Sequence, residues 1–337
     1  MDDLYAQLPG LLLPWYKENR RELPWRQDKE PYHVWLSEIM LQQTRVEAVK
    51  GYYLRFLQTL PTIRALADAD EETLNKLWEG LGYYSRVRNL HKAAMQIMER
   101  HSGIFPQDYT CVRALCGIGD YTAGAVCSIC FDLPTPAVDG NVLRVCARLT
   151  ADASPIDKPQ TKKALTEALA AVYPKESGDF TQALMELGAT VCVPNGAPNC
   201  AVCPLSGICL AHKSGTQLQY PVKSEKKPRK TQQLTVLLLH DEDDFALRKR
   251  PGTGLLAGLW EFPHLDGSLT AAQVLDYLEQ QGIEALDMEK TVEKIHIFTH
   301  VQWHMTGMFI RCRRGGNYTW GKPSDYALPT AFRIFLD

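Results

Sequence analysis

Four cysteines lie close together in the second half of the chain, at Cys192, Cys200, Cys203 and Cys209, with the spacing C-x7-C-x2-C-x5-C. Thiolates that bind one metal centre need such closeness, because short loops close at small entropic cost. A zinc ribbon usually has two C-x2-C pairs separated by a longer stretch. This segment has one pair flanked by single cysteines. The spacing favours a [4Fe–4S] cluster held by all four thiolates, with zinc or unrelated thiols as the alternatives.

Length and composition are those of an ordinary globular protein. The chain has 337 residues, of which 45% are hydrophobic and 23% charged, so about two domains are expected. We find no apolar run of the ~18 residues that a membrane helix needs, and no signal peptide with a basic start. We therefore predict a cytoplasmic protein, in which the remaining cysteines are reduced and buried rather than joined in disulfides.

The charge is nearly balanced over the chain. Residues 1–230 contain 27 basic and 25 acidic side chains, whereas residues 231–337 contain 10 and 14. The net charge of −2 argues against a simple basic protein that coats DNA. It does not exclude an enzyme that acts on nucleic acid, because affinity depends on where the charges lie.

The sequence pattern divides the chain into three parts. Residues 1–212 are typical of helices, and the spacing of Leu36, Ile39, Met40 and Gln43 predicts one of them. Residues 231–337 are typical of a small α+β domain. The predicted strands of that domain are 234–240, 245–248, 295–299, 305–312 and 318–320, and the predicted helix is 269–281.

Residues 213–230, between these parts, are polar and basic and lack apolar periodicity, which predicts an exposed linker. A solvated tether is the simpler interpretation of its charges. Contact with phosphate is the alternative for Lys226, Lys227, Arg229 and Lys230.

A glycine-containing turn lies between two helical patterns in residues 115–123. Gly117 and Gly119 permit a tight turn, and the helix that follows has free backbone N–H groups at its start. Such groups bind phosphate without a charged side chain, so we expect Gly117, Gly119 and Tyr121 to contact DNA phosphate. An ordinary corner between two helices is the alternative for this motif taken alone.

Two carboxylates stand where acid–base chemistry is plausible. Glu38 lies within an otherwise apolar helical stretch, so its side chain is either exposed or buried with a raised pKa. Asp139 and Asn141 stand at the predicted start of a helix, where an isolated aspartate would be a helix cap.

The combination of these motifs resembles a known family. The Gly-x-Gly turn, the sequence Val-Asp-Gly-Asn-Val at 138–142 and the four cysteines resemble the helix-hairpin-helix base-excision glycosylases that carry a [4Fe–4S] cluster. Residues 23–26, 37–44, 80–86 and 255–263 narrow the resemblance to adenine DNA glycosylases of the MutY type. The resemblance covers nearly the whole chain, and its motifs occur in the family's order.

The resemblance implies a mainly α N-terminal glycosylase domain of two helical lobes and a smaller α+β, Nudix-like C-terminal domain. It implies double-stranded DNA with adenine opposite 8-oxoguanine or guanine as the partner, a monomer by default, and association with the nucleoid. The implied segments are a catalytic domain at 1–212, a helix-hairpin-helix motif at about 108–131, a cluster loop at 192–209, a basic interdomain linker at 213–230 and an 8-oxoguanine recognition domain at 231–337.

Catalytic roles also follow from this resemblance. Glu38 would protonate the flipped adenine, because an unprotonated purine anion is a poor leaving group. Asp139 would remain ionised and stabilise the cationic sugar, as paired carboxyl groups do in glycoside hydrolysis. Asn141 would orient the sugar, the water or Asp139. Tyr121 stands where bifunctional relatives place a Schiff-base lysine, so strong strand-cleaving activity is not expected.

Other positions match substrate-binding residues of the family. The adenine pocket would contain Arg21, Trp25, Arg26 and Gln182. Gln43, Leu81 and Tyr83 would invade the base stack around the lesion, and Thr44 would bind substrate beside them. Phe298, Thr299 and His300 would inspect 8-oxoguanine.

Several positions depart from the family's pattern. Thr299 replaces the common serine, which keeps a hydroxyl but adds a methyl group. The first cysteine gap is one residue longer than the commonest pattern, and Cys116 stands where proline is frequent. No R-E-x-x-E-E sequence follows Gly258, so we expect recognition without nucleotide hydrolysis.

Three other functions are disfavoured. An endonuclease III-type glycosylase/lyase predicts lysine at position 121 and no C-terminal domain. A non-catalytic protein that binds damaged DNA predicts loss of Glu38 or Asp139, and both are present. A Nudix hydrolase with a helical accessory domain predicts the missing Nudix sequence.

Overall fold

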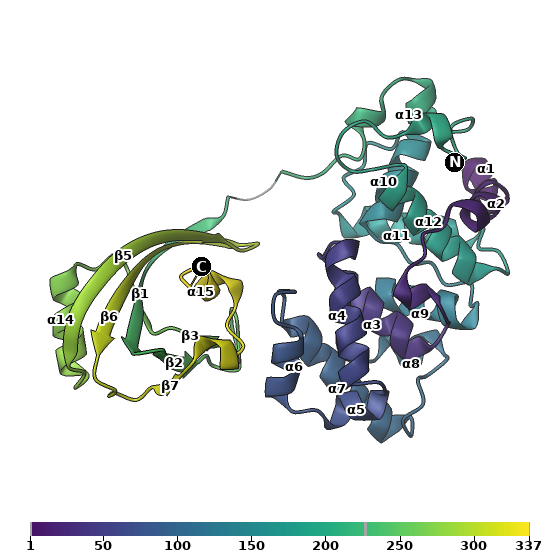
Figure 1. The fold of residues 1–337 in the computed structure, drawn as a ribbon. Coiled ribbons are helices and arrows are strands. Elements are labelled where there is room, and N and C mark those ends of the chain that lie inside the picture. The colour runs from purple at the N-terminus through teal and green to yellow at the C-terminus, as the bar shows by residue number, and fades with distance from the viewer. Residues whose placement is uncertain (1, 226–227, 337) are drawn as a thin grey trace. The chain divides into compact units, whose positions relative to one another are not determined.

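The chain groups into two compact units. The structure is a computed structural model that describes residues 2–225 and 228–336. Unit 1 comprises Met1–Ala69 with Asn89–Lys226, and unit 2 comprises Asp70–Arg88 with Lys227–Asp337 (Figure 1). The domain boundaries expected from the sequence stay a prediction.

Two of the linker residues considered for phosphate contact, Lys226 and Lys227, lie outside the described residues. On the N-terminal side of this gap, the chain that follows α13 (Leu210–Lys213) contains a single short 3-10 helix, η3 (Gln217–Gln219). On the other side the chain enters strand β1 at Lys230.

Unit 1 is built from helices, as the sequence pattern predicts. Helix α7 (Ser85–Arg100) begins among the residues grouped with unit 2 and continues in unit 1. The other elements of unit 1 are α1 (Asp2–Ala6), α2 (Leu8–Asn19), η1 (Pro24–Arg26), α3 (Pro31–Leu41), α4 (Val46–Thr59), α5 (Ile63–Asp68), α8 (Tyr109–Arg113), α9 (Asp120–Phe131), α10 (Gly140–Thr150), α11 (Pro159–Ala170), α12 (Ser177–Thr190), η2 (Cys200–Val202) and α13 (Leu210–Lys213).

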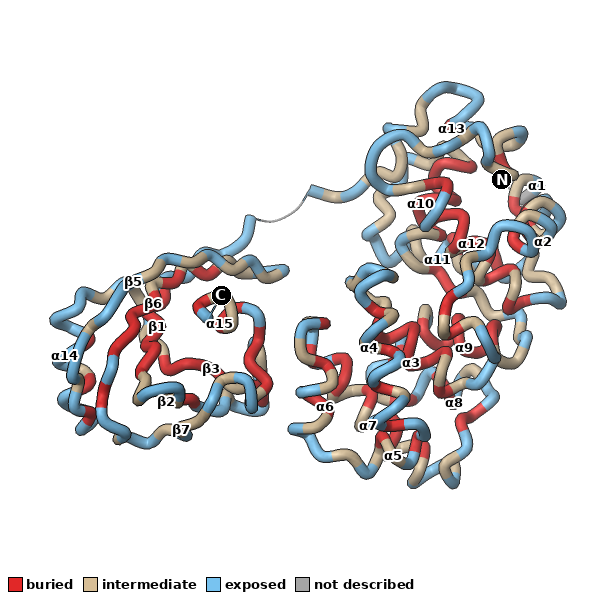
Figure 2. Tube along the Cα trace, viewed as in Figure 1, coloured by how far each residue is buried: buried red, intermediate tan, exposed pale blue. Residues whose placement is uncertain are grey.

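One apolar core holds α2, α10 and α12 together. Leu8 and Leu12 present one face of α2, because residues four apart lie on the same side of a helix. They pack in the same core as Val142 of α10 and Phe180 and Leu187 of α12. Figure 2 shows the buried stretches of α10 and α12 in red. This packing places the start of α10, which carries Asp139 and Asn141, beside α12.

Helix α3 is shorter than its apolar spacing suggests. It ends at Leu41, and Gln43 beyond it has a φ of 61°. A turn in which Thr44 N–H donates to Leu41 O at 3.3 Å replaces the next helical turn. The expectation that the helix extends to Gln43 is therefore wrong. Helical spacing in a sequence does not reveal a local turn that ends the helix.

Helices α8 and α9 enclose the Gly-x-Gly turn. Gly117 has a φ of 74°, and a Cβ there would lie 2.5 Å from Asn89 Cβ, so both conformation and space require glycine. Gly119 differs, because it has a φ of −92°, precedes α9 as its cap residue and has open space where a Cβ would be. The start of α9 is therefore left uncovered by the side chain of its cap residue.

Unit 2 contains a seven-stranded sheet. Its main path has the order β3-β2-β1-β6-β5, in which β1 and β6 are parallel and β5 and β6 are antiparallel. The elements are α6 (Glu71–Leu77), β1 (Lys230–Asp241), β2 (Asp244–Lys249), β3 (Trp260–Glu261), β4 (His264–Asp266), α14 (Ala271–Gln280), β5 (Ala285–Ile297), β6 (Val301–Cys312), β7 (Thr319–Gly321), η4 (Pro323–Asp325) and α15 (Thr330–Arg333). Strand β5 extends ten residues before the expected start at 295, since its exposed and half-buried residues give a weak apolar signal.

Strand β1 is covered on both faces. Because successive side chains of a strand point to opposite sides, Val236 and Leu238 join one core and Leu237 and Leu239 join another. The first core includes Phe332 of α15, and the second includes residues of α14. This arrangement explains the continuous buried run in β1.

Residues 70–88 are grouped with the C-terminal part of the chain. Lys76 Nζ donates to Ser324 O at 2.5 Å, and Arg333 forms an ion pair with Glu79. Arg88 Nη1 donates to Ala257 O at 2.8 Å. Local patterns in the sequence do not predict this grouping, because the contacts join residues far apart in the chain.

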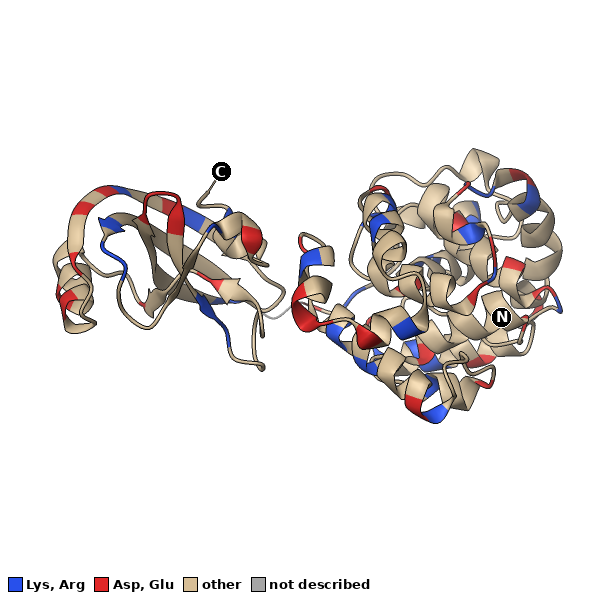
Figure 3. Cartoon of the chain, turned by 60° about the horizontal axis from the view of Figure 1, so that its bottom comes forward, with Lys and Arg blue, Asp and Glu red and all other residues tan. Residues whose placement is uncertain are grey.

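Basic and acidic residues are interspersed along the elements of each unit (Figure 3). This distribution agrees with the nearly balanced composition. Among the described residues, the structure has no helix long and apolar enough to cross a membrane.

Candidate active site

A cavity of about 550 Å³ in unit 1 gathers the predicted catalytic and adenine-binding residues. Side chains from η1, α3, α9, α12 and the start of α10 line it. The predicted residues among them are Arg21, Trp25, Arg26, Glu38, Gln43, Thr44, Tyr121, Asp139, Asn141 and Gln182.

Glu38 is the buried carboxyl group of this cavity. It lies on α3 among apolar neighbours and is only 6% exposed. Burial raises the pKa of Glu38 to about 7, the Tyr121 hydrogen bond opposes that rise, and the negative charge of Asp139 adds to it. Of the two interpretations that the sequence allows, the structure favours the buried one. A carboxyl group with this pKa can donate a proton near neutral pH.

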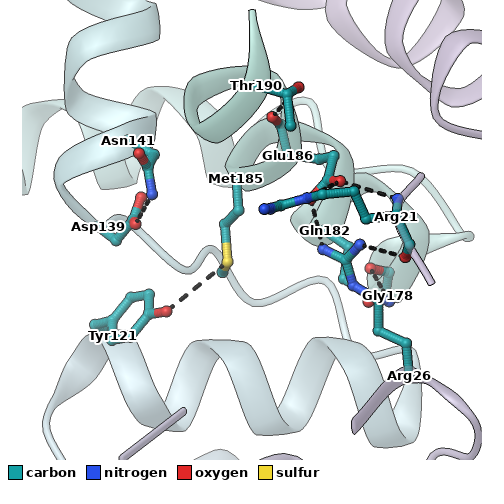
Figure 4. Close-up of polar contacts among 10 residues, drawn as sticks. All are labelled: Arg21, Arg26, Tyr121, Asp139, Asn141, Gly178, Gln182, Met185, Glu186 and Thr190. Carbon is teal, nitrogen blue, oxygen red and sulfur yellow. Dashed lines mark hydrogen bonds and ion pairs between the residues drawn. The ribbon is translucent and has the colours of Figure 1, made fainter. Parts of the chain in front are cut away.

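Tyr121 connects α9 to Glu38. Its hydroxyl donates a hydrogen bond to Glu38 Oε2 and lies 3.8 Å from Met185 Sδ, toward which Figure 4 shows it pointing. Burial, followed by the charges of Glu38 and Asp139, raises the pKa of Tyr121 well above its usual value. The hydroxyl is therefore protonated and acts as a donor. A phenol at this position offers no amine that could form a Schiff base.

Asp139 both caps α10 and lines the cavity. Its Oδ1 accepts from Val142 N–H at 2.8 Å, and its Oδ2 accepts from Asn141 Nδ2 at 2.7 Å (Figure 4). Burial raises the pKa of Asp139 above its usual value, and these two hydrogen bonds offset only part of that rise. Asp139 is thus a helix cap, as expected for an isolated aspartate at this position, and also a residue of the cavity lining.

A hydrogen bond from Arg144 fixes the side chain of Asn141. Arg144 Nη2 donates to Asn141 Oδ1 at 2.8 Å and to Gly188 O at 2.7 Å, and Arg144 Nε donates to Cys192 O at 2.7 Å. A Cβ at Gly188 would lie 2.5 Å from Asn141 Cβ, so α12 can approach α10 this closely only with glycine. Arg144 also connects the segment of Cys192 to the residue that orients Asp139.

A buried ion-pair group borders the cavity. Glu186 is fully buried and accepts from Arg21 Nε at 2.7 Å and from Arg26 Nη2 at 2.8 Å (Figure 4). Burial alone would raise the pKa of Glu186, but the hydrogen bonds from the two arginines lower it to about 2. Arg26 also donates to Arg21 O at 3.1 Å. The two arginines are therefore fixed in position by one carboxylate.

Sequence reasoning missed Glu186, Met185 and Arg144. Glu186 follows Gln182 by four residues, so both lie on one face of α12, and that spacing could have indicated it. Its position within an apolar helix is the same signal that drew attention to Glu38. Nothing in the local sequence indicates the contacts of Arg144.

The four predicted cluster cysteines line one small cavity together with Arg148. Arg148 Nη1 donates to Cys192 Sγ at 3.3 Å, and Gln217 Nε2 donates to Cys200 Sγ at 3.9 Å. Burial raises the pKa of Cys203 to about 11, and the neighbouring thiols contribute to this rise.

Four cysteine thiolates are the usual ligand set of an iron–sulfur cluster, and this cavity contains four cysteines. Among the described residues, no group of three or more His, Cys, Asp or Glu side chains is arranged to hold one metal ion. Thiols that share a cavity and raise one another's pKa match a site at which metal replaces protons, and Arg148 supplies a positive charge and a donor to sulfur.

Unit 2 contains the remaining predicted residues. Tyr83 is 51% exposed, has a φ of 48°, and its hydroxyl lies 3.2 Å from Thr299 Oγ1. Leu81 is only 6% exposed, so the structure does not present it as an exposed wedge. The structure thus brings Tyr83 and Thr299 together within this unit.

The residues Phe298, Thr299 and His300 form the tip of the hairpin between β5 and β6. Phe298 N–H donates to Val301 O at 2.8 Å, which closes the tip. The Phe298 ring packs edge-on against Trp303 at 4.8 Å, and Thr299 and His300 are exposed. The aromatic residue therefore anchors the tip while its neighbours face solvent.

Comparison with known proteins supports these observations. Residues 36–171 match the HhH-GPD superfamily of base excision DNA repair proteins, and residues 234–337 match a NUDIX domain. The chain is 35% identical to the adenine DNA glycosylase of Rattus norvegicus, over 86% of this chain and 68% of that protein. It is 33% identical to that of Buchnera aphidicola, over 89% and 85%.

The chain belongs to the adenine DNA glycosylase family. The prediction that the chain is a member of this family is therefore confirmed, as is the prediction that it is an enzyme of the DNA glycosylase class. The Arabidopsis thaliana family member is 38% identical, and the chain spans 55% of its length.

Solved structures of related proteins agree with the helical fold of this family member. A thermostable thymine-DNA glycosylase matches with a TM-score of 0.58 and 26% identity, over 63% of this chain and 98% of that one. A non-covalent endonuclease III–DNA complex matches with a TM-score of 0.53 and 23% identity, over 63% and 98%. The predicted fold, a helical glycosylase domain followed by a smaller Nudix-like domain with a sheet, is confirmed.

Proposed function

We propose that the chain is a monofunctional DNA glycosylase that hydrolyses the N-glycosidic bond of adenine paired with 8-oxoguanine or guanine in duplex DNA. The main support for this proposal is that one cavity contains the carboxyl groups of both Glu38 and Asp139. Glu38 is buried and has a pKa of about 7. Since the base stack hides the bond in duplex DNA, the adenine must leave the stack to enter the cavity.

In this mechanism the proton moves first from Glu38 to adenine. As the bond between the sugar and the base breaks, its electron pair leaves with the protonated base and positive charge develops on the sugar. The Asp139 carboxylate, oriented by Asn141, stabilises that charge. A water molecule then attacks the sugar carbon and gives a proton to the Glu38 carboxylate, which restores the acid.

The other cavity residues would bind the adenine. Trp25 lies in the cavity wall with its ring edge-on to Tyr53 at 5.5 Å, which fixes its orientation. Arg21 and Arg26, already fixed by Glu186, supply donors with little further loss of entropy on binding. We assign Gln182 to the same pocket.

Further family positions complete the proposed DNA contacts. Phosphate contacts are proposed for the backbone at Gly117, Gly119 and Tyr121, because the start of α9 is uncovered. Gln43, Thr44 and Tyr83 are assigned to the bases around the lesion, and Phe298, Thr299 and His300 to 8-oxoguanine. Leu81, which is buried, is assigned no base contact.

We propose that Cys192, Cys200, Cys203 and Cys209 hold a [4Fe–4S] cluster. When bound, the cluster would supply a four-thiolate crosslink of this loop and a centre able to transfer an electron. Protein purified without oxygen should contain about four iron and four sulfide ions per chain. Cys200→Ser should lose iron and Cys130→Ser should not; stoichiometric zinc in place of iron would refute the assignment.

The proposed activity is tested by single-turnover reactions on duplexes with adenine opposite 8-oxoguanine or guanine. Adenine release should be followed by strand cleavage only after alkali, because Tyr121 is no amine nucleophile. Glu38→Gln should abolish release while the duplex still binds. Failure of the unmodified protein to release adenine would reject the function, and an active Glu38→Gln variant would reject the acid assignment.

A further inference from the structure

Lys162 of α11 lies at the border of two neighbouring cavities in unit 1. One is the cavity of Glu38 and Asp139, and the other has a volume of about 210 Å³. Lys162 and Tyr121 line both of them. Its side chain therefore stands at the edge of the proposed active site.

The cationic side chains of the catalytic cavity are not equivalent. Arg21 and Arg26 both form ion pairs with Glu186. Within residues 2–225 and 228–336, Lys162 forms no ion pair with a carboxylate, and it is half-buried in the lining of the cavity that also contains Glu38 and Asp139. Of the three cations that line this cavity in the described structure, Lys162 is the one that remains available to an external anion.

A flipped nucleotide supplies such anions, because a phosphodiester group is attached on both the 5′ and the 3′ side of its sugar. The carboxyl groups of Glu38 and Asp139 disfavour phosphate inside the cavity. The lining of the same cavity includes Gly140, which is exposed and has open space where a Cβ would be. This lining thus combines an open, exposed backbone position with a lysine that forms no ion pair among the described residues.

We propose that Lys162 binds a phosphodiester that flanks the flipped adenosine. This assignment rests on the proposed function, because it assumes that the sugar of the flipped adenosine lies at Asp139. Lys162 neutralises one phosphate at the rim while Glu38 and Asp139 act on the sugar and base inside. The neighbouring residue Lys163 cannot replace it, because its side chain is 78% exposed and pairs with Glu167 at 3.8 Å.

The first experiment measures affinity for a duplex that binds but is not cleaved. A suitable duplex carries 2′-fluoro-2′-deoxyadenosine opposite 8-oxoguanine, since the fluorine disfavours positive charge on the sugar. Lys162→Gln should weaken binding about fivefold to tenfold at ~0.1 M salt and reduce the slope of log K against log salt by about one. Lys162→Arg should restore most of the affinity, and Lys163→Gln should change it less than twofold.

The second experiment locates the phosphate. Duplexes that carry a neutral methylphosphonate immediately 5′ or 3′ of the adenosine remove one negative charge at a time. With one of these duplexes, the unmodified protein should bind about as weakly as the Lys162→Gln variant binds the unmodified duplex. Combining that methylphosphonate with Lys162→Gln should weaken binding no more than either change alone.

The outcomes separate the inference from the function on which it rests. If the unmodified protein excises adenine but Lys162→Gln binds with unchanged affinity and salt slope, the inference is wrong. Additive losses with both methylphosphonate duplexes would also refute a flanking phosphate. Absence of adenine excision by the unmodified protein would instead reject the proposed function.

Discussion

The Tyr121 hydroxyl donates a hydrogen bond to the carboxyl group of Glu38, although the two residues are 83 positions apart in the chain. This contact joins α9 to α3 and has a definite electrostatic effect. It lowers the pKa of Glu38, which burial has raised to about 7. The pH dependence of catalysis is therefore the most direct test of this pair.

Adenine excision should fall as pH rises through about 7, because the proposed reaction needs protonated Glu38. Tyr121→Phe removes a hydrogen bond that favours the carboxylate, so the pKa of Glu38 should rise and the alkaline limb should move up by about one pH unit. Single-turnover rates from pH 5 to 9 measure the shift. Tyr173→Phe, which removes a half-buried hydroxyl that is hydrogen-bonded to Thr181, is the control and should leave the alkaline limb in place.

Glu186 should contribute strongly to stability above pH 4.5. Its pKa in the folded protein is about 2 against an ordinary 4.5, so its contribution is present above 4.5 and is lost as pH falls toward 2. Glu186→Gln leaves two arginines without their carboxylate and should lower the free energy of unfolding by about 3 kcal/mol at pH 7. Urea unfolding at pH 7 and pH 3 measures this.

The difference between the unmodified protein and Glu186→Gln should shrink at the lower pH. Glu167→Gln breaks an exposed pair and should cost less than ~0.5 kcal/mol, which makes it a matched control. Equal effects of the two substitutions would contradict the role assigned to burial.

Gly188→Ala should damage both the packing of α12 on α10 and the activity. The added methyl group would meet Asn141 Cβ at 2.5 Å, so the helices must separate or Asn141 must turn away from Asp139. We expect a loss of about 1–3 kcal/mol in the free energy of unfolding and a lower single-turnover rate. Gly10→Ala, in a helix with open space, should be neutral or slightly stabilising; an unimpaired Gly188→Ala would show that the contact is not limiting.

The hydroxyl of Thr299 should matter more than its methyl group, because the hydroxyl lies 3.2 Å from that of Tyr83. Thr299→Ser should retain the preference for 8-oxoguanine over guanine opposite adenine. Thr299→Val keeps the shape but removes the hydroxyl, and should reduce this preference several-fold. The ratio of excision rates on the two duplexes is the measurement, and a Thr299→Val variant with an unchanged ratio would contradict the assignment.

Sequence patterns predicted the helical part and the α+β part, because apolar periodicity and the positions of glycine are local properties. The family resemblance, in turn, named ten of the residues that line the main cavity. Sequence reasoning misplaced the end of α3 and the start of β5, where a local turn and an exposed strand interrupt the local signals. It missed Glu186, whose role depends on arginines 160 and 165 positions away.

The order of residues along the chain sets which chemical groups are available: carboxyl groups, a phenol in place of an amine, and four closely spaced thiols. The protonation states of the carboxyl groups depend on the fold. Glu38 becomes an acid with a pKa of about 7 because other helices bury it, whereas Glu186 stays ionised because two arginines meet it. Burial and pairing arise from contacts between distant parts of the chain, so identical carboxyl groups acquire opposite properties.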